Sequence, residues 1–364
     1  MIKAVRKLSA FGCVSLVLLA VAVVDAFSQS GDNPLITLSD CWKASLTDAV
    51  VSPPVADANQ LYIAQEGGRI SAFSLLSGTR VWSSEVGGEI VSNVVPDGKN
   101  LYLVADAGGK RSVLRSISAV SGITNLDTEI SFGENLRLGV SMGRIVAVYE
   151  SGSVAAYEQG SGKRVWQVNL SPVNIEAVAF NEQNIVIPTA DKKLEVLSAS
   201  DGRSLMSVTT RATVTAVGMI EEDLLWGEDH GDLVRYDSED KYVSWKYKNG
   251  ARIGAVKGTD RGILAASNDN FVYLLSGYNG DIRWKKRLSG RIAFMTVNGE
   301  LGVMLAIGDP MAVLVNLENG KQVGQYLAGD GELFTFAPVI AGDQIFFFTG
   351  GQVVAKSTKP CRTN

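Results

Sequence analysis

Short apolar runs alternate with glycine-containing turns along almost the whole chain, and the pattern repeats about every 40 residues. In one unit, the apolar run 61–64 is followed by the alternating run 69–73, and a turn at Gly78 leads into residues 79–82. Runs of four to six residues rich in β-branched and aromatic side chains, separated by turns, are typical of strands joined as hairpins. No extended helical stripe of apolar residues competes with this pattern. The chain is therefore predicted to be all-β.

The turn glycines and the tryptophans that follow them define the repeat. The glycines are Gly78, Gly122, Gly162, Gly202, Gly280 and Gly320. The position four residues after each is occupied in turn by Trp82, Leu126, Trp166, Met206, Trp284 and Gly324. Trp245 stands where a repeat that has lost its glycine needs it, and Trp42 begins the series. A period of this length is typical of units that bury their apolar faces against their neighbours, and it provides four strands per unit.

The number of units indicates a closed ring. Seven repeats are complete, and the eighth has only three strands, near 334–340, 344–348 and 352–356. Residues 40–46 carry Trp42 without preceding strands of their own, so they can supply the missing outer strand. Radial closure leaves only short, protected strand edges. The sequence thus predicts an eight-bladed β-propeller of four-stranded antiparallel blades, closed by an N-terminal strand, with seven blades as the main alternative.

The N-terminus has the features of a secretory signal. Residues 1–26 contain three basic residues, an apolar segment and a small-residue cleavage site. The alternative is an uncleaved anchor helix, for which the apolar segment is short. Cys13 precedes most of that segment and has Ala10, not Leu, three residues upstream, so lipid attachment is not predicted. The expected organisation is a signal at 1–26, an extension at 27–39, the propeller at 40–357 and a tail at 358–364.

Two cysteines remain after cleavage of the signal. Cys41 lies beside the tryptophan of the closing strand, and Cys361 lies just after the last strand. Because the fold brings these ends together, an exported protein is predicted to join them in a disulfide. The alternative is a pair of free thiols in a reducing compartment.

The net negative charge of the chain makes anionic partners unfavourable. The chain has a net charge of −4, and removal of residues 1–26 leaves −6, which does not favour nucleic acid or an anionic membrane. No stable membrane insertion is expected once the signal has been removed. One basic segment stands out on an outer strand and the turn after it: Arg283, Lys285, Lys286, Arg287 and Arg291. Cations at an open edge discourage pairing with other chains, and the alternative is a surface that docks an acidic partner.

Residues with catalytic chemistry are few. The single histidine, His230, lies in the acidic segment 228–232, whose composition suits a hairpin turn and whose spacing matches no calcium loop. The sequence contains no CxxCH haem motif, no adjacent cysteines and no specific Ser/His/Asp set. Trp226 occupies a strand position that is aliphatic in most repeats, and it is expected in a blade core. We therefore expect no catalytic, cofactor or metal site.

The repeat resembles that of the quinoprotein-type propeller family, which includes proteins that carry pyrroloquinoline quinone and relatives without the cofactor. The resemblance covers residues 40–357 and rests on the apolar strands, the Ser/Asp/Asn-Gly turns and the tryptophans. The final repeats, VNLENGKQVGQ and FTFAPVIAGDQIFFFTGGQVVAKS, are most similar to the BamB family, the propeller subunits of the machinery that assembles outer-membrane β-barrels. The resemblance implies that the repeat tryptophans pack between blades and donate their ring N–H to a backbone carbonyl: Trp42, Trp82, Trp166, Trp245 and Trp284.

The function that this resemblance implies is a non-catalytic, exported scaffold that binds envelope proteins, including outer-membrane assembly components. The expected location is the periplasm or the outside of the cell, in association with the outer membrane. BamB-like proteins are usually lipid-anchored, and the signal of this chain departs from that pattern. The alternative is a quinoprotein-type dehydrogenase, or a sensor of quinone or another ligand, that binds pyrroloquinoline quinone with calcium.

Overall fold

The computed structural model describes residues 35–132 and 135–361. The predicted signal, Cys13, most of the 27–39 extension and the last three residues lie outside the described residues. Within them, the regular structure consists of strands in eight sheets and two single turns of 3₁₀ helix, η1 (Glu66–Gly68) and η2 (Ile175–Ala177). The predictions of an all-β chain and of eight blades are confirmed, and the seven-bladed alternative is wrong.

The first four blades follow the order of the chain. Blade 1 contains β2 (Val55–Ala56), β3 (Gln60–Gln65), β4 (Arg69–Ser74) and β5 (Arg80–Glu85). Blade 2 contains β6 (Glu89–Ile90), β7 (Val95–Asp97), β8 (Asn100–Asp106), β9 (Ser112–Ser118) and β10 (Thr124–Ile130). Blade 3 contains β11 (Leu136–Ser141), β12 (Arg144–Tyr149), β13 (Ser153–Glu158) and β14 (Arg164–Asn169). Blade 4 contains β15 (Ala179–Phe180), β16 (Asn184–Thr189), β17 (Lys193–Ser198) and β18 (Ser204–Thr209).

The next three blades repeat this plan, and the eighth combines both ends of the chain. Blade 5 contains β19 (Val214–Ile220), β20 (Asp223–Glu228), β21 (Asp232–Asp237) and β22 (Tyr242–Lys248). Blade 6 contains β23 (Ile253–Thr259), β24 (Gly262–Ser267), β25 (Phe271–Leu275) and β26 (Ile282–Arg287). Blade 7 contains β27 (Ile292–Asn298), β28 (Leu301–Ala306), β29 (Met311–Asn316) and β30 (Gln322–Leu327). Blade 8 contains β31 (Val339–Ala341), β32 (Gln344–Thr349), β33 (Gln352–Ser357) and β1 (Ser39–Ser45).

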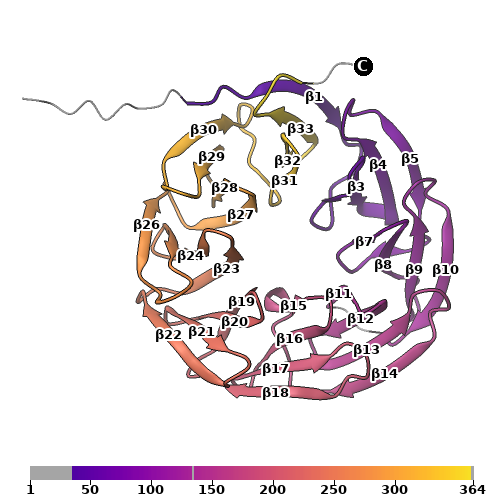
Figure 1. The fold of residues 1–364 in the computed structure, drawn as a ribbon. Coiled ribbons are helices and arrows are strands. Elements are labelled where there is room, and N and C mark those ends of the chain that lie inside the picture. Colours follow the sequence, from indigo (N-terminus) through magenta and orange to yellow (C-terminus); the bar gives the residue numbers. More distant parts are fainter. Residues whose placement is uncertain (1–34, 133–134, 362–364) are drawn as a thin grey trace, which may run out of the picture. The chain divides into compact units, whose positions relative to one another are not determined.

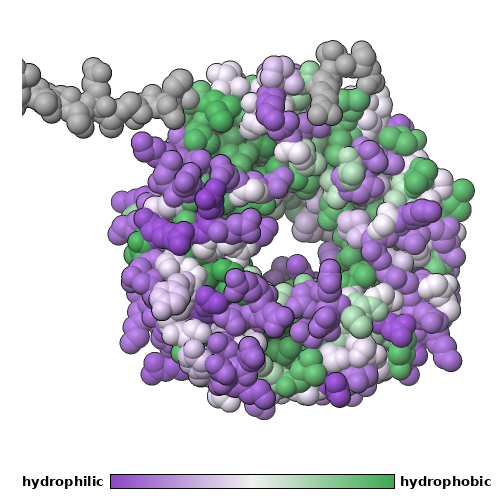
Figure 2. Space-filling model, viewed as in Figure 1, coloured by the Kyte–Doolittle hydropathy of each residue, from purple (hydrophilic) through white to green (hydrophobic). Residues whose placement is uncertain are grey.

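Each blade runs from the centre of the ring to its rim, as Figure 1 shows. An opening lies at the centre, and polar side chains gather over much of the face seen in Figure 2. Because the strands alternate in direction, the turns that follow the first and third strands of every blade lie on one face. We call it the glycine-turn face, because it carries the turns with Gly78, Gly122, Gly162, Gly202, Gly280 and Gly320. The opposite crossover face carries the turns after the second strands and the connections between blades.

The inner strands are continuous apolar runs because each blade is covered on both sides. In β3, Leu61 and Ile63 pack with blade 8, while Tyr62 and Ala64 pack with blade 2. Alternate residues of one strand therefore enter two different cores. Full burial of such an aliphatic or aromatic side chain contributes about 1.5–3 kcal/mol. The stability of the ring thus resides between the blades.

The N-terminal strand closes the ring. β1 pairs antiparallel with β33, with Trp42 opposite Ala355 and Ser45 opposite Gln352. A β-bulge between Asp40 and Trp42 interrupts the register. Without β1, the outer edge of β33 would present unpaired backbone groups. The predicted closing strand is confirmed, within one residue of its expected limits.

Tryptophans in five blades contact the following blade. Their ring N–H groups donate to backbone carbonyls at 2.8–3.0 Å: Trp42 to Leu75, Trp82 to Ala119, Trp166 to Ala199, Trp245 to Gly277 and Trp284 to Leu317. Each ring also covers the turn glycine of that next blade. At Gly202 (φ +73°), a Cβ atom would lie 2.5 Å from a ring carbon of Trp166. Both the backbone conformation and the close approach therefore require glycine.

One contact of the N-terminal segment was not predicted. Ile36 forms a parallel bridge with Gly324 in β30 of blade 7. Gly324 occupies the position that carries tryptophan in other repeats, and a Cβ there would lie 3.2 Å from the carbonyl oxygen of Ile36. The segment that precedes β1 can approach the rim because no side chain stands at this position.

Candidate functional site

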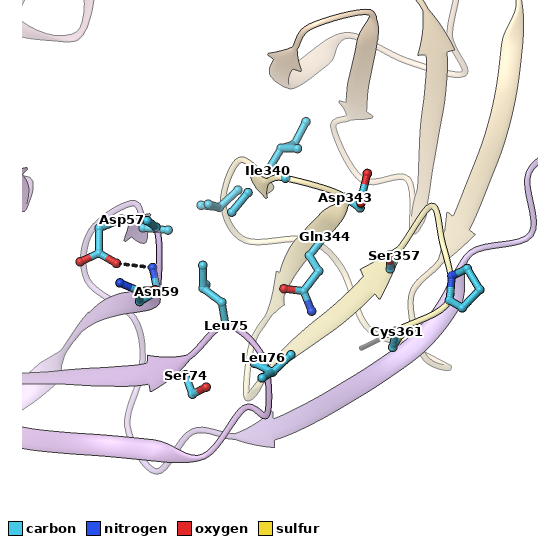
Figure 3. Close-up of a pocket in the computed structure, with 16 residues that line it drawn as sticks. Asp57, Asn59, Ser74, Leu75, Leu76, Ile340, Asp343, Gln344, Ser357 and Cys361 are labelled. Atoms are coloured by element: carbon cyan, nitrogen blue, oxygen red, sulfur yellow. Dashed lines mark hydrogen bonds between the residues drawn. The ribbon is translucent and has the colours of Figure 1, made fainter. Parts of the chain in front are cut away.

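A deep hollow lies at the seam between blades 8 and 1. This seam groove has a volume of about 980 Å³ and opens on the glycine-turn face. It is lined by residues 56–59, 74–76 and 339–344, together with Ser357, Pro360 and Cys361. Figure 3 shows the side chains of Leu75 and Gln344 between the two blades. The groove thus exists only because the two ends of the chain meet.

The polar groups of the seam groove are engaged in local structure. Asp57 accepts hydrogen bonds from the backbone N–H groups of Asn59 and Gln60, both at 2.7 Å, and from the Tyr62 hydroxyl at 2.6 Å. Burial raises the pKa of Tyr62, and the hydrogen bond to Asp57 raises it further. The Asp343 carboxylate lies 2.9 Å from the Lys359 ammonium. These carboxylates act as a turn cap and an ion-pair partner.

The seam groove has no apparent nucleophile with a general base. The only histidine of the sequence lies on the opposite face, in the turn after β20. Cys361 is oxidised in a disulfide, and therefore offers no thiolate. Apolar side chains at the sides, such as Leu76 and Ile340, alternate with backbone and carboxylate groups. Such a lining suits the binding of a polypeptide segment better than a reaction.

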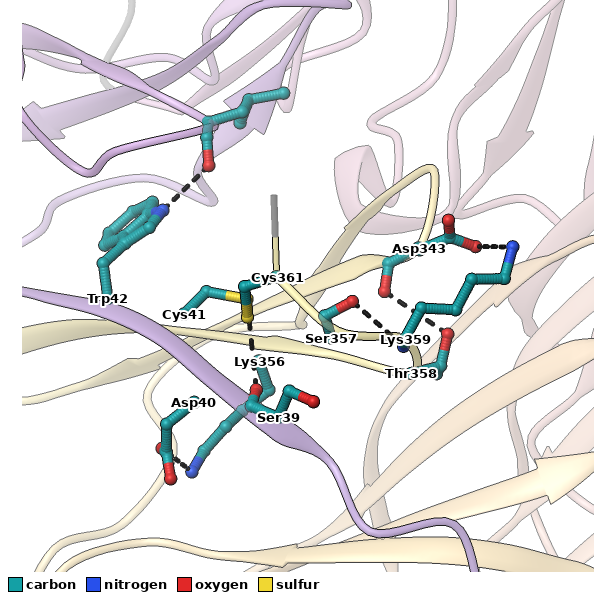
Figure 4. Close-up of a disulfide and its surroundings, with 11 residues drawn as sticks. Ser39, Asp40, Cys41, Trp42, Asp343, Lys356, Ser357, Thr358, Lys359 and Cys361 are labelled. Carbon is teal, nitrogen blue, oxygen red and sulfur yellow. Dashed lines mark hydrogen bonds and ion pairs between the residues drawn. A yellow bond between two sulfur atoms is a disulfide. The ribbon is translucent and has the colours of Figure 1, made fainter. Parts of the chain in front are cut away.

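A disulfide fixes the seam beside the groove. Cys41 and Cys361 are bonded, with their Cα atoms 5.4 Å apart (Figure 4). Cys41 is the extra residue of the β-bulge in β1. A bulge changes the direction of a side chain that would otherwise point to alternate faces of the sheet like its neighbours. The same strand is held by the Trp42 N–H, which donates at 2.8 Å to the carbonyl of Leu75, a lining residue of the groove.

A buried cation adds to the contacts of the closing strand. The Lys356 ammonium forms an ion pair with Asp40 and lies 4.6 Å from the centre of the Tyr326 ring. The hydrogen bond to Lys356 holds the pKa of Asp40 below its usual value, despite some burial. Lys356 is almost buried, whereas Asp40 is exposed. The ion pair between Lys356 and Asp40 therefore links β33 to the closing strand β1.

The other residues singled out from the sequence lie away from the groove. Lys285 and Arg287 of β26 stand 5.3 and 6.0 Å from the Phe271 ring centre, and burial lowers the pKa of Lys286. The basic segment thus follows the outer edge of blade 6. Trp226 is buried in a blade core and donates to Glu228 at 3.0 Å.

The acidic turn around His230 differs from the sequence expectation in one respect. Glu228, His230 and Asp232 bring a ligating atom each within 4.8 Å of one another. The sequence placed these residues in one turn, but it did not indicate that both carboxylates are buried.

The sequence analysis also did not predict the seam groove, although the sequence contains a pattern that points to it. The stretches VSPPVADANQLYIA from Val51 and FAPVIAGDQIFFFT from Phe336 resemble each other. They begin the first and last units, which ring closure places side by side.

No helix in the described part of the chain combines the length and the apolar character needed to cross a bilayer. A family model described as outer membrane protein assembly factor BamB matches residues 37–125, 150–258 and 229–360. A relative with that same description, from Yersinia pestis, is 26% identical over 297 residues, which cover 80% of this chain and 67% of the relative.

Two solved structures are similar to the ring. The computationally designed Ika8 protein gives a TM-score of 0.74 at 14% identity, over 86% of this chain and 98% of the other. BamB from Moraxella catarrhalis gives 0.68 at 14% identity, over 88% of this chain and 100% of the other. At such identities the likeness shows the fold alone.

Proposed function

Since the chain belongs to the BamB family of outer membrane protein assembly factors, we propose that it is a non-catalytic, exported scaffold that binds proteins of outer-membrane assembly. The observation that carries the proposal is the family match at residues 37–125, 150–258 and 229–360. This match extends around most of the ring, from the closing strand to the last blade. Similarity confined to one blade would support only a shared repeat.

The geometry supports a binding role. Indole N–H groups join five blades to their neighbours, and a disulfide closes the seam. A rigid disc of this kind loses little conformational entropy when a partner docks. The seam groove offers apolar side chains next to backbone groups, the combination that an extended polypeptide requires. We propose that the scaffold acts at the periplasmic side of the outer membrane.

Site-specific photocrosslinking in cells tests this proposal. A photoreactive residue would replace exposed side chains on each surface: Leu76 and Tyr278 on the glycine-turn face, Ile307 and Leu327 on the crossover face, and Val165 on the rim. We expect one face to capture outer-membrane assembly components reproducibly, while the rim position captures few or none. Failure of every position to capture such a component, with the protein exported and folded, would refute the scaffold role.

We further propose that the protein works without a quinone cofactor. The seam groove presents Asp57 and Asp343, and the nearby Lys359 is paired with Asp343. The carboxylates of pyrroloquinoline quinone would need free cations, which this lining does not provide. Titration of the purified protein with the quinone and calcium should leave its visible spectrum equal to the sum of the components. A new saturable absorbance would contradict the proposal.

A further inference from the structure

The turn between β20 and β21 on the crossover face is fixed by both of its neighbours. Glu228 is the last residue of β20 and Asp232 is the first of β21. The Asp229 N–H donates to the Thr213 carbonyl at 3.0 Å, and the Gly231 carbonyl accepts from Asn249 at 2.9 Å. Gly231 has φ +98°, and a Cβ there would lie 2.4 Å from the nitrogen of Ala251. The backbone that carries the three side chains is therefore preorganised.

Two buried carboxylates flank one imidazole in this turn. His230 Nδ1 lies 3.6 Å from Glu228 Oε2, and His230 Nε2 lies 3.2 Å from Asp232 Oδ2. The side chains of Glu228 and Asp232 are only 1% and 6% exposed, whereas that of His230 is 47% exposed. The two acids are therefore withdrawn from solvent, whereas the imidazole reaches it. A hollow of about 570 Å³ lies over His230 and Asp232.

The two acids differ in how their charge is compensated. Asp232 Oδ2 lies 2.5 Å from the Lys246 ammonium. Burial tends to raise the pKa of Asp232, but the hydrogen bond and charge of Lys246, with a contribution from His230, bring it below its usual value. Glu228 Oε1 accepts the Trp226 N–H at 3.0 Å, but Oε2 has no hydrogen-bond partner among the described residues. A buried carboxylate oxygen without a partner is costly, so a cation is expected to occupy its free side.

The propeller repeat does not itself require these ligands. The last residue of the second strand is uncharged in six of the other seven blades: Gln65, Tyr149, Thr189, Ser267, Ala306 and Thr349. Blade 2 has Asp106 there, which accepts a hydrogen bond from the Gly108 N–H. Acids in other turns after second strands also have local partners: Glu150 accepts from Asn135, Asp191 from Thr189, Asp269 from the Phe271 N–H and Asp309 from the Met311 N–H. The set of Glu228, His230 and Asp232 is therefore particular to blade 5.

We propose that Glu228, His230 and Asp232 bind a divalent transition-metal ion of the zinc type, with water in the open coordination position. One imidazole and two carboxylates form the mixed nitrogen and oxygen set that zinc accepts, whereas calcium needs six to eight oxygens. Tetrahedral zinc with bonds near 2.0–2.1 Å places its ligands about 3.3 Å apart. The three donor atoms lie within 4.8 Å of one another, so side-chain shifts of about 1.5 Å or less bring them to this spacing.

The surrounding charges set the expected affinity. Lys246 competes with the metal for Asp232, and Arg211 and Lys248 line the same hollow. Asp229 lines it as well, with its carboxylate 3.5 Å from His230 Nδ1, so three acids and three basic residues surround the site.

Calorimetric titration of the chelator-treated mature protein with zinc tests the proposal. We expect one zinc ion per chain and no saturable binding of calcium. Cobalt substitution should give the intense visible bands of a four-coordinate site. His230→Ala and Glu228→Gln should each weaken zinc binding about 10–100-fold. The matched control is Asp191→Asn in the turn of blade 4, which should leave the titration unchanged.

The outcomes separate a metal site from a structural turn. His230 is largely exposed, so His230→Ala should keep the wild-type near-ultraviolet circular dichroism, and any loss of binding then reflects a lost ligand. Absence of stoichiometric zinc binding would overturn the proposal. Zinc binding that is equally strong in His230→Ala would also overturn it.

Discussion

Removal of the Cys41–Cys361 disulfide should weaken the ring at its seam first. The two cysteines are separated by 320 residues. For a loop of that length, the chain-entropy model gives a loss of about 5–6 kcal/mol, which is an upper limit, and measured losses are typically about 2–4 kcal/mol. We therefore expect Cys41→Ser with Cys361→Ser to lower the free energy of unfolding by about 2–5 kcal/mol.

The closing strand keeps other contacts in this variant. β1 retains its ladder with β33, the Trp42 N–H donates to Leu75, and Lys356 pairs with Asp40. These contacts are local and lack the covalent link, so β1 can detach while the other blades remain folded. Loss of the disulfide should thus appear as early opening of residues 39–45, before the global transition.

Denaturant unfolding followed by circular dichroism measures the global effect, and native-state hydrogen exchange measures the local one. The single variants Cys41→Ser and Cys361→Ser supply the control, because each removes the same bond. Both should match the double variant to within a few tenths of a kcal/mol. If the double variant retains the wild-type midpoint and the wild-type protection of β1, the reasoning is refuted and the strand ladder alone holds the seam.

Two further predictions concern the blade contacts and the ion pair at the rim. Gly202→Ala should cost more than the about 1–2 kcal/mol of a left-handed alanine, because its Cβ would also meet the Trp166 ring at 2.5 Å. The control is Gly308→Ala, which has a similar φ of +71° and nothing within 4 Å, so equal losses of thermal stability would exclude the clash. The pKa of Asp40 is lowered in the fold, so its contribution is complete above the usual aspartate pKa near 4 and is lost as the pH falls through the lower value. Denaturation midpoints of the wild type and Asp40→Asn should therefore converge on acidification, and a constant difference would show that Lys356 does not stabilise the charged form.

The blade count and the closure followed from the sequence because each repeat marks its own turn. A left-handed glycine and a tryptophan four residues later report one local geometry, and the three copies that keep both residues, with Trp82, Trp166 and Trp284, report the period. One repeat has no glycine at this turn, and the preceding blade has no tryptophan to cover it. Lys241 adopts the left-handed conformation at φ +58°, and the preceding blade carries Met206 in place of tryptophan. A side chain at this turn therefore meets no indole ring.

The features that could not be predicted from the sequence depend on contacts between distant segments. The bridge of Ile36 with Gly324 joins the extension to blade 7, and no local pattern announces it. The seam groove combines the turns of the first and last units, so its shape depends on closure. Glu228 is buried and accepts the Trp226 N–H, whereas its position in a polar segment favoured an exposed turn. The residue types of these sites could therefore be recognised in the sequence, but the burial of their side chains could not be predicted from it.

Because the first strand completes the last blade, the ring can close only at the end of synthesis. Asp40 and Lys356 are 316 residues apart, so β1 is made near the beginning of translation and its partner near the end. Until then, blades 1 to 7 form an arc with two uncovered ends, on which Leu61 and Ile63 at one end and Val303 and Leu305 at the other await blade 8. A contact of such long sequence separation forms slowly. The growing protein therefore passes through an open stage with two exposed apolar ends, and closure of the seam ends that stage.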